Sequence, residues 1–164
     1  MNDVPLAVGL RLADAKDMPG LLRIEEDCFA NEKFSEQVVR AFIEREDAFI
    51  VVAVEGTEIV GSALCIFSDC MGEGKIASIA VLRKRRGEGI GSQLLEECEN
   101  MFRSRNLTRY SLEVETSNEP AISLYLTRGY EVKGTIKDFY TGGRDAYAME
   151  KVVGSRKVVN VQVS

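Results

Sequence analysis

The sequence contains no histidine. Because histidine is the commonest general base and the commonest metal ligand near neutral pH, acid–base chemistry in this chain must come from carboxylate, tyrosine, lysine or water. The four cysteines form no Cys-x-x-Cys pair. We therefore predict no metal site and no disulfide, but reduced and packed cysteines in a cytoplasmic protein.

Long apolar runs and an excess of positive charge are also missing. No apolar run approaches the roughly 18 residues that a membrane-spanning helix needs, and the first residues lack the basic, apolar and small segments of a signal peptide. The net charge of −5 opposes a broad basic face for nucleic acid, despite four consecutive basic residues at 83–86. We expect neither a membrane nor a nucleic acid as a partner.

What is present is an ordinary globular composition, with 45% hydrophobic and 29% charged residues in 164, which predicts one domain. Hydrophobic residues recur every second residue in some segments, as in strands, and about every 3.6 residues in others, as in helices. These patterns predict a mixed α/β fold, with antiparallel hairpins before one or two crossover units. Strands are predicted over residues 8–13, 48–55, 57–67, 75–81, 109–115, 130–136 and 144–153. Helices are predicted after Asp17 as the capping residue, after Ser35, and over residues 90–105 and 118–128, with a loop at 69–74 and a further strand signal in the valines of 158–163.

The most informative stretch is residues 78–92, where a β-branched run ends at basic residues, three glycines alternate, and an amphipathic helix begins. Glycines let main-chain N–H groups approach an anion, and the helix dipole favours negative charge there, which predicts a pyrophosphate site. A P-loop is excluded because no Gly-Lys-Ser/Thr follows the glycines. A dinucleotide-binding fold is disfavoured, because its fingerprint is Gly-x-Gly-x-x-Gly and because four predicted strands precede the turn.

Three segments in register carry a family resemblance. Arg86-Gly-Glu-Gly-Ile-Gly91 matches Gln/Arg-x-x-Gly-x-Gly/Ala, residues 118–130 match Asn-x-x-Ala-x-x-Leu-Tyr-x-x-x-Gly-Phe/Tyr, and residues 138–149 are similar to a closing strand pair. The chain thus resembles the GCN5-related N-acetyltransferase (GNAT) superfamily, in particular protein N-terminal acetyltransferases of the RimI and archaeal Ard1 type. The resemblance implies a mixed sheet of about seven strands, four helices and a splayed strand pair, with the GNAT domain over residues 1–153 and a C-terminal tail over 154–164.

The resemblance also implies acetyl-CoA as co-substrate and the residues that hold it. The main chain of Ile79, Ala80 and Val81 would pair with the pantetheine as an added strand does, although these residues also fit a plain core strand. The remaining implied contacts are Asn118, which also fits a helix N-cap before Pro120, and the turn residues Arg86, Gly87, Glu88, Gly89, Ile90, Gly91 and Ser92.

Two residues are implied in catalysis. Glu113 lies on the polar face of a predicted strand, where RimI-like enzymes place their general base, and Glu115 on the same face is the alternative, as is a water chain. Tyr125 is assigned to the leaving thiolate. Because an ordinary tyrosine pKa of about 10 exceeds the 8.5 of a thiol, a hydrogen bond to the developing thiolate suffices.

The substrate implied by the resemblance is the α-amine at the N-terminus of a protein or peptide. Ribosomal proteins are among the implied substrates. Phe34 and Tyr140 are the candidate contacts, in the two segments that hold the peptide in this family. The chain departs from relatives at residues 29–34, which lack proline, and at Lys75, where several relatives have histidine or tyrosine. Two alternatives stay open: an acetyltransferase that acts on small-molecule amines or on lysine, and a non-catalytic acyl-CoA-binding module. The preferred N-terminal residues of the substrate and the oligomeric state also stay open.

Overall fold

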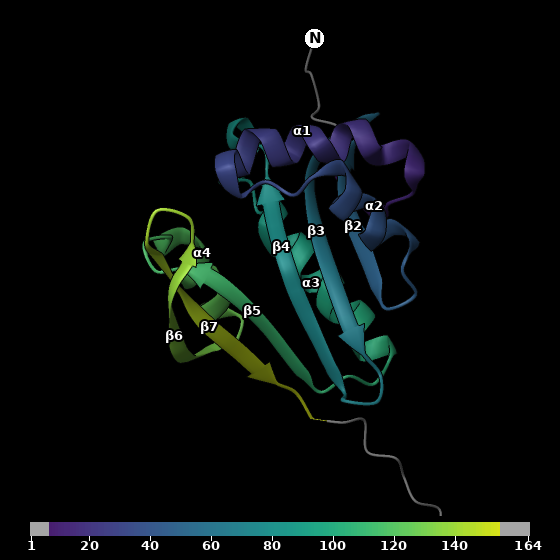
Figure 1. Ribbon diagram of the computed structural model, residues 1–164. Helices are drawn as coiled ribbons and strands as arrows, with labels where there is room; N and C mark the ends of the chain where they lie inside the picture. The colour runs from purple at the N-terminus through teal and green to yellow at the C-terminus, as the bar shows by residue number, and fades with distance from the viewer. Residues whose placement is uncertain (1–6, 155–164) are drawn as a thin grey trace, which may run out of the picture.

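The computed structural model describes residues 7–154, which form a seven-stranded mixed sheet with four α-helices (Figure 1). The strands lie in the order β1-β2-β3-β4-β5-β7-β6. They are β1 Gly9–Leu12, β2 Ala48–Glu55, β3 Glu58–Ser68, β4 Glu73–Val81, β5 Arg109–Glu115, β6 Glu131–Tyr140 and β7 Arg144–Val152. The helices are α1 Met18–Phe29, α2 Glu36–Glu44, α3 Ile90–Ser104 and α4 Glu119–Thr127. The predicted fold class is confirmed.

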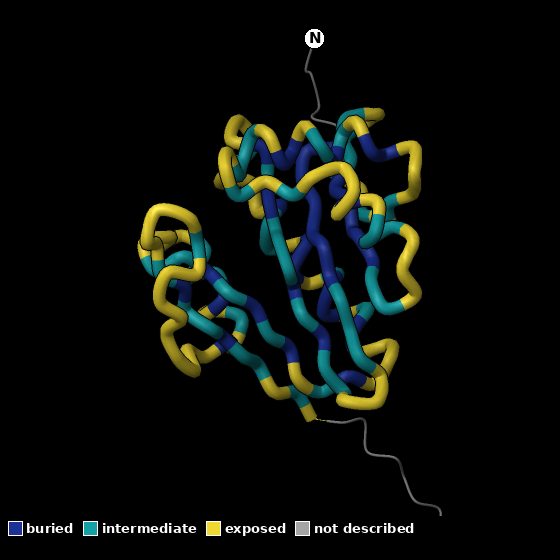
Figure 2. The backbone as a smooth tube through the Cα atoms, in the orientation of Figure 1, coloured by how far each residue is buried: buried dark blue, intermediate teal, exposed yellow. Residues whose placement is uncertain are grey.

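The core lies where α1, α2 and α3 cover the β2–β4 half of the sheet. Figure 1 shows α1 and α2 on one face and α3 on the other, and burial concentrates on these strands (Figure 2). Val51 of β2 and Leu94 and Leu95 of α3 are fully buried. Burial of one large apolar side chain contributes roughly 1.5–3 kcal/mol to the stability of the folded state. The buried side chains of this half of the sheet therefore stabilise the elements that carry the loops at its edge.

The splayed strand pair is β4 and β5. They run parallel and pair only through Glu73–Ile76 and Arg109–Leu112. Beyond these residues the strands separate, and Figure 1 shows a V that widens toward α1. Leu82 donates its backbone N–H to the Val60 carbonyl of β3 (2.9 Å). Because backbone groups alternate along a strand, those of Ile79 and Val81 face away from β3, into the gap.

Several predicted details were wrong. Asp17 precedes α1 but does not cap it with its side chain, because its carboxylate accepts two hydrogen bonds from Arg11 (2.7 and 2.8 Å) and one from the Asp14 backbone (2.9 Å). Strand β4 begins at Glu73, inside the predicted loop, and β6 continues to Tyr140 instead of ending at 136. In both cases a partner strand supplies the pairing that the local sequence does not signal. Cys70 is exposed in the β3–β4 turn, although the cysteines were expected to pack.

The predicted tail strand lies outside the described residues, so it stays a prediction, as does the domain boundary at 153. Among residues 7–154, no helix combines the length and the hydropathy that crossing a membrane requires.

Candidate active site

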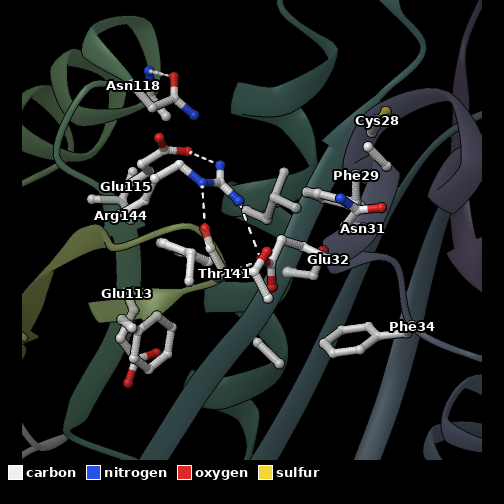
Figure 3. Close-up of a pocket in the computed structure, with 18 of the residues that line it drawn as sticks. Cys28, Phe29, Asn31, Glu32, Phe34, Glu113, Glu115, Asn118, Thr141 and Arg144 are labelled. Carbon is white, nitrogen blue, oxygen red and sulfur yellow. Dashed lines mark hydrogen bonds and ion pairs between the residues drawn. The ribbon is translucent and has the colours of Figure 1, made fainter. Parts of the chain in front are cut away.

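A cavity of about 920 Å³ opens where β4 and β5 separate. Its walls come from α1 and the residues that follow it, from β4 and β5, from the start of α4, and from the turn between β6 and β7 (Figure 3). Six of the predicted site residues line it: Phe34, Ile79, Glu113, Asn118, Tyr125 and Tyr140. The structure therefore brings together side chains that lie up to about a hundred positions apart in the sequence.

The predicted cofactor residues Ala80, Val81 and 86–92 do not line this cavity. Ala80 is buried in the core. The Val81 carbonyl accepts hydrogen bonds from Cys28 Sγ and from Arg86 Nε, both at 3.3 Å. These residues lie at the end of β4, in the turn that follows it and in the first turn of α3, next to the gap between the strands.

The glycine-rich turn has the conformation that an anion site needs. Gly87 and Gly89 both have φ of 84°, in the left-handed region that favours glycine, and no atom lies within 4 Å of a Cβ placed at either residue. Helix α3 starts directly after Gly89. Within residues 7–154, none of the six backbone N–H groups of residues 87–92 donates a hydrogen bond. The turn thus presents a row of free donors at a helix N-terminus.

Two of the basic residues before the glycines form ion pairs: Lys84 lies 3.2 Å from Glu58, and Arg85 binds Glu55 and Glu88. Arg83 donates its backbone N–H to the Asp27 carboxylate and its Nε–H to the Asp27 backbone carbonyl. Arg86 forms no ion pair with any described residue, which leaves its charge available to an anion.

Arg128 was missed by the sequence reasoning. It follows α4 and donates to the Ser92 hydroxyl in the first turn of α3, which places a guanidinium beside the free N–H groups. Arg128 and Ser92 lie 36 positions apart in the sequence, so their contact follows only from the tertiary structure.

Glu113 and Lys75 form an ion pair across the narrow end of the splay, with 2.6 Å between Lys75 Nζ and Glu113 Oε1. Both side chains are partly buried, with exposed fractions of 38% for Lys75 and 18% for Glu113. The pair arises because Lys75 lies opposite Ser111 in the parallel register, two residues before Glu113. No described residue donates to Glu113 Oε2, so this oxygen remains free on the cavity side. Glu115 also lines the cavity but is bound by Arg144 and Ser117.

Tyr125 is 8% exposed and its ring packs edge-on against Tyr130, with centroids 5.9 Å apart. Burial, with a smaller contribution from Tyr140, raises the pKa of Tyr125 well above its ordinary value. This raised pKa keeps the hydroxyl protonated near neutral pH, and the hydroxyl makes no hydrogen bond within residues 7–154, so its proton is available to a ligand. At the start of the same helix, Asn118 Oδ1 caps α4 by accepting from Ala121 N at 3.3 Å.

The predicted substrate contacts lie on facing walls. Phe34 stacks on Phe42, with centroids 6.1 Å apart, and its backbone N–H donates to Glu25 at 2.9 Å. Tyr140 packs under the guanidinium of Arg144, which lies 5.5 Å from its ring centre. Glu25 is 2% exposed and lines the cavity too; it was not predicted, because a glutamate in an amphipathic helix gives no signal of burial. Burial raises the pKa of Glu25.

No cluster of three or more metal-ligating side chains occurs among the described residues.

Comparison with known proteins identifies the family. Residues 18–130 match the Acetyltransferase (GNAT) family. An N-alpha-acetyltransferase of Sulfolobus acidocaldarius is 32% identical over 151 residues, which cover 85% of this chain and 89% of that protein. Among solved structures, the ribosomal-protein-S18-alanine N-acetyltransferase from Escherichia coli has a TM-score of 0.84 at 22% identity, covering 93% of this chain and 98% of that one. Arabidopsis thaliana Naa50, in complex with a bisubstrate analogue, has a TM-score of 0.80 at 27% identity, covering 90% and 100%. The predicted resemblance is confirmed: the chain belongs to the GNAT acetyltransferase family and is an N-acetyltransferase.

Proposed function

We propose that this protein transfers the acetyl group of acetyl-CoA to the α-amino group of protein N-termini, by direct attack in a ternary complex. The observation that carries the proposal is the meeting of Glu113 from β5 and Tyr125 from α4 in one cavity, at the point where β4 and β5 separate. In one acyl transfer, a base can accept the proton of the attacking amine while an acid on another element donates to the leaving sulfur. Relatives named N-alpha-acetyltransferase support the substrate class.

The residues present fit acetyl-CoA. The free N–H groups of 87–92 and the unpaired charge of Arg86 suit a pyrophosphate. The backbone of Ile79 and the N–H of Val81 face the gap that β5 leaves unpaired, and they suit an amide-containing arm that pairs like a strand. Asn118 uses only Oδ1 for its cap, so Nδ2 remains to donate to that arm. Relatives support this cofactor, since solved structures with CoA or a CoA conjugate share the fold.

In the proposed mechanism, Glu113 accepts the proton of the attacking amine on its free oxygen, directly or through water, while Lys75 fixes the carboxylate. The Val81 N–H polarises the carbonyl oxygen under attack. Tyr125 donates a hydrogen bond to the departing sulfur. Since its pKa is raised by burial, Tyr125 stabilises the thiolate without giving up its proton fully. No covalent bond to the protein is needed.

An α-amine suits this site better than a lysine amine. With a pKa of about 7.7–8.0, roughly a tenth of an α-amine is neutral at pH 7, whereas fewer than about one lysine in a thousand is. The site has a carboxylate as its base and no histidine, and this base suits the α-amine, which loses its proton more easily than a lysine amine does. Phe34 and Tyr140 would contact the first residues of the peptide. The N-terminus of a ribosomal protein is one candidate, because a fold neighbour acetylates ribosomal protein S18. A cytoplasmic location remains a prediction.

Acetylation of a peptide library, with the acetyl group located by mass spectrometry, tests the proposal. Acetyl groups on N-terminal amines are expected. Acetyl groups found mainly on lysine side chains would contradict it.

Glu113→Gln should lower kcat/KM most below about pH 7.5, where little of an α-amine is neutral. The defect should shrink as the pH rises, because free amine then accumulates without help from the base. The measurement is the pH profile of kcat/KM for the variant and the wild type, on a peptide with a free N-terminus.

Glu150→Gln is the matched control, because Glu150 is a half-buried strand carboxylate paired with Arg109 outside the cavity. This control should follow the wild-type profile. A Glu113→Gln defect that is equal at all pH values would limit Glu113 to a positioning role and point to Glu115 or a water chain as the base.

A further inference from the structure

A buried polar cluster lies next to Tyr125 but outside the cavity. Tyr130, between α4 and β6, is 1% exposed and donates its hydroxyl to Glu99 Oε2 of α3 at 2.9 Å. Glu99 is 3% exposed, and Lys151 of β7 donates to both of its carboxylate oxygens, at 3.0 and 3.2 Å. None of these three residues lines the cavity. Glu99, Tyr130 and Lys151 are called the tyrosine anchor below.

Stability alone does not account for the tyrosine anchor. Glu99 lies four positions after Leu95 and three before Phe102, so it shares the buried face of α3 with these apolar side chains. Removing a carboxylate from water costs free energy, which a buried ion pair often only just offsets. Apolar side chains of similar volume would fill the same space without that cost. What the polar cluster adds is a fixed geometry, because each of its hydrogen bonds has a preferred direction.

The tyrosine anchor reaches Tyr125 through the ring of Tyr130. The two rings pack edge-on at an angle of 63°, and the Tyr130 backbone N–H donates to the Tyr125 carbonyl at 3.0 Å. Tyr130 is thus held at both ends, by its backbone and by its hydroxyl. The Tyr125 hydroxyl has no hydrogen-bond partner among residues 7–154, so packing alone sets the direction in which it points. The anchored ring of Tyr130 is one of the surfaces that sets it.

We propose that the tyrosine anchor positions Tyr125 for the departing sulfur: Glu99 fixes the ring of Tyr130, and this ring directs the Tyr125 hydroxyl. The proposal rests on the proposed function, through the role of Tyr125 in it. Glu99 and Tyr130 are positioning residues, since neither lines the cavity. Glu99 belongs to α3, whose first turn carries the free N–H groups. One helix therefore holds the pyrophosphate and aligns the donor for the sulfur at the other end of the same cofactor, where small misplacements lower the rate.

Tyr130→Phe removes only the hydroxyl that Glu99 holds. It should lower kcat roughly three- to tenfold and leave KM for acetyl-CoA close to that of the wild type, because a misdirected Tyr125 hydroxyl matters mainly when charge develops on sulfur. Glu99→Gln should lose less, since its amide oxygen can still accept from Tyr130. Tyr110→Phe is the matched control, because it also removes a buried hydroxyl, one without a partner and away from the cavity. This control should keep full kcat.

A double-mutant cycle separates positioning from a general structural effect. In the Tyr125→Phe background no hydroxyl remains to be directed, so Tyr130→Phe should cause no further loss of kcat. A merely structural role would lower kcat by the same factor in both backgrounds. Thermal melts give a readout that is independent of activity. Tyr130→Phe should lower the Tm by roughly 3–10 °C, because it removes a hydrogen bond to a charged group, whereas Tyr110→Phe should not melt below the wild type.

Full kcat in Tyr130→Phe, or an equal loss in both backgrounds of the cycle, would overturn the positioning role. An unchanged Tm in Tyr130→Phe would overturn the hydrogen bond to Glu99, and the tyrosine anchor with it. Acetylation of lysine side chains instead of N-termini would reject the proposed substrate, whereas the cycle, measured on that lysine peptide, would still decide whether Tyr130 positions Tyr125.

Discussion

Tyr125→Phe should lower kcat by roughly 100-fold, the usual contribution of one acid–base group, while the affinity for acetyl-CoA stays close to that of the wild type. Tyr125 is only 8% exposed, and no described residue forms a hydrogen bond with its hydroxyl. A donor with no partner in the resting protein is needed mainly when negative charge develops on sulfur. Its removal therefore affects the transition state more than the bound ground state.

Tyr110→Phe is the control for this prediction. The Tyr110 hydroxyl is also buried without a hydrogen-bond partner, but Tyr110 does not line the cavity. Steady-state kinetics should show full kcat for Tyr110→Phe. Full kcat in Tyr125→Phe would make Tyr125 an ordinary core residue.

Gly89→Asp should abolish the rise in melting temperature that acetyl-CoA gives to the wild type. A ligand that binds only the native state stabilises it by about 2.7 kcal/mol at a hundred times its Kd, which corresponds to a rise of roughly 5–10 °C for a chain of this size. The substitution adds a carboxylate to the turn whose six backbone N–H groups have no partner among the described residues, so it should repel the pyrophosphate. Thermal melts with and without acetyl-CoA provide the measurement, and NAD should give no shift with either protein.

Gly89→Asn separates charge from backbone strain. Gly89 has φ of 84° with open space around it, so asparagine and aspartate carry a similar conformational cost. The asparagine variant should keep part of the acetyl-CoA shift. A full shift in Gly89→Asp would show that the pyrophosphate does not bind at this turn.

The fold could be predicted from the sequence because its local signals agree with one another. The apolar face of α3, the glycines at 87 and 89, and the Glu55-Gly56 turn between β2 and β3 each follow from spacing and backbone preference. The alternation of polar residues on β5 correctly placed Glu113 and Glu115 on one face toward the cavity.

The missing parts of the site depend on contacts between distant elements. The Lys75–Glu113 pair is set by the parallel register of β4 and β5, which no local pattern encodes. The Glu32–Arg144 contact joins residues 112 positions apart. Outside the site, Glu99 belongs to a helix face that is polar by pattern, yet it is 3% exposed and binds Tyr130 and Lys151. In each case, tertiary packing supplies a partner for a charge that the sequence alone would assign to solvent.

The most direct test of the central claim compares two peptides of one sequence that contains an internal lysine, one with a free N-terminus and one with a blocked N-terminus. Acetylation rates are measured at pH 7 with saturating acetyl-CoA, and the modified amine is located by mass spectrometry. The account predicts that the free peptide is acetylated at its α-amine and that the blocked peptide reacts far more slowly. Equal rates on the two peptides, with the acetyl group on lysine in both, would contradict it.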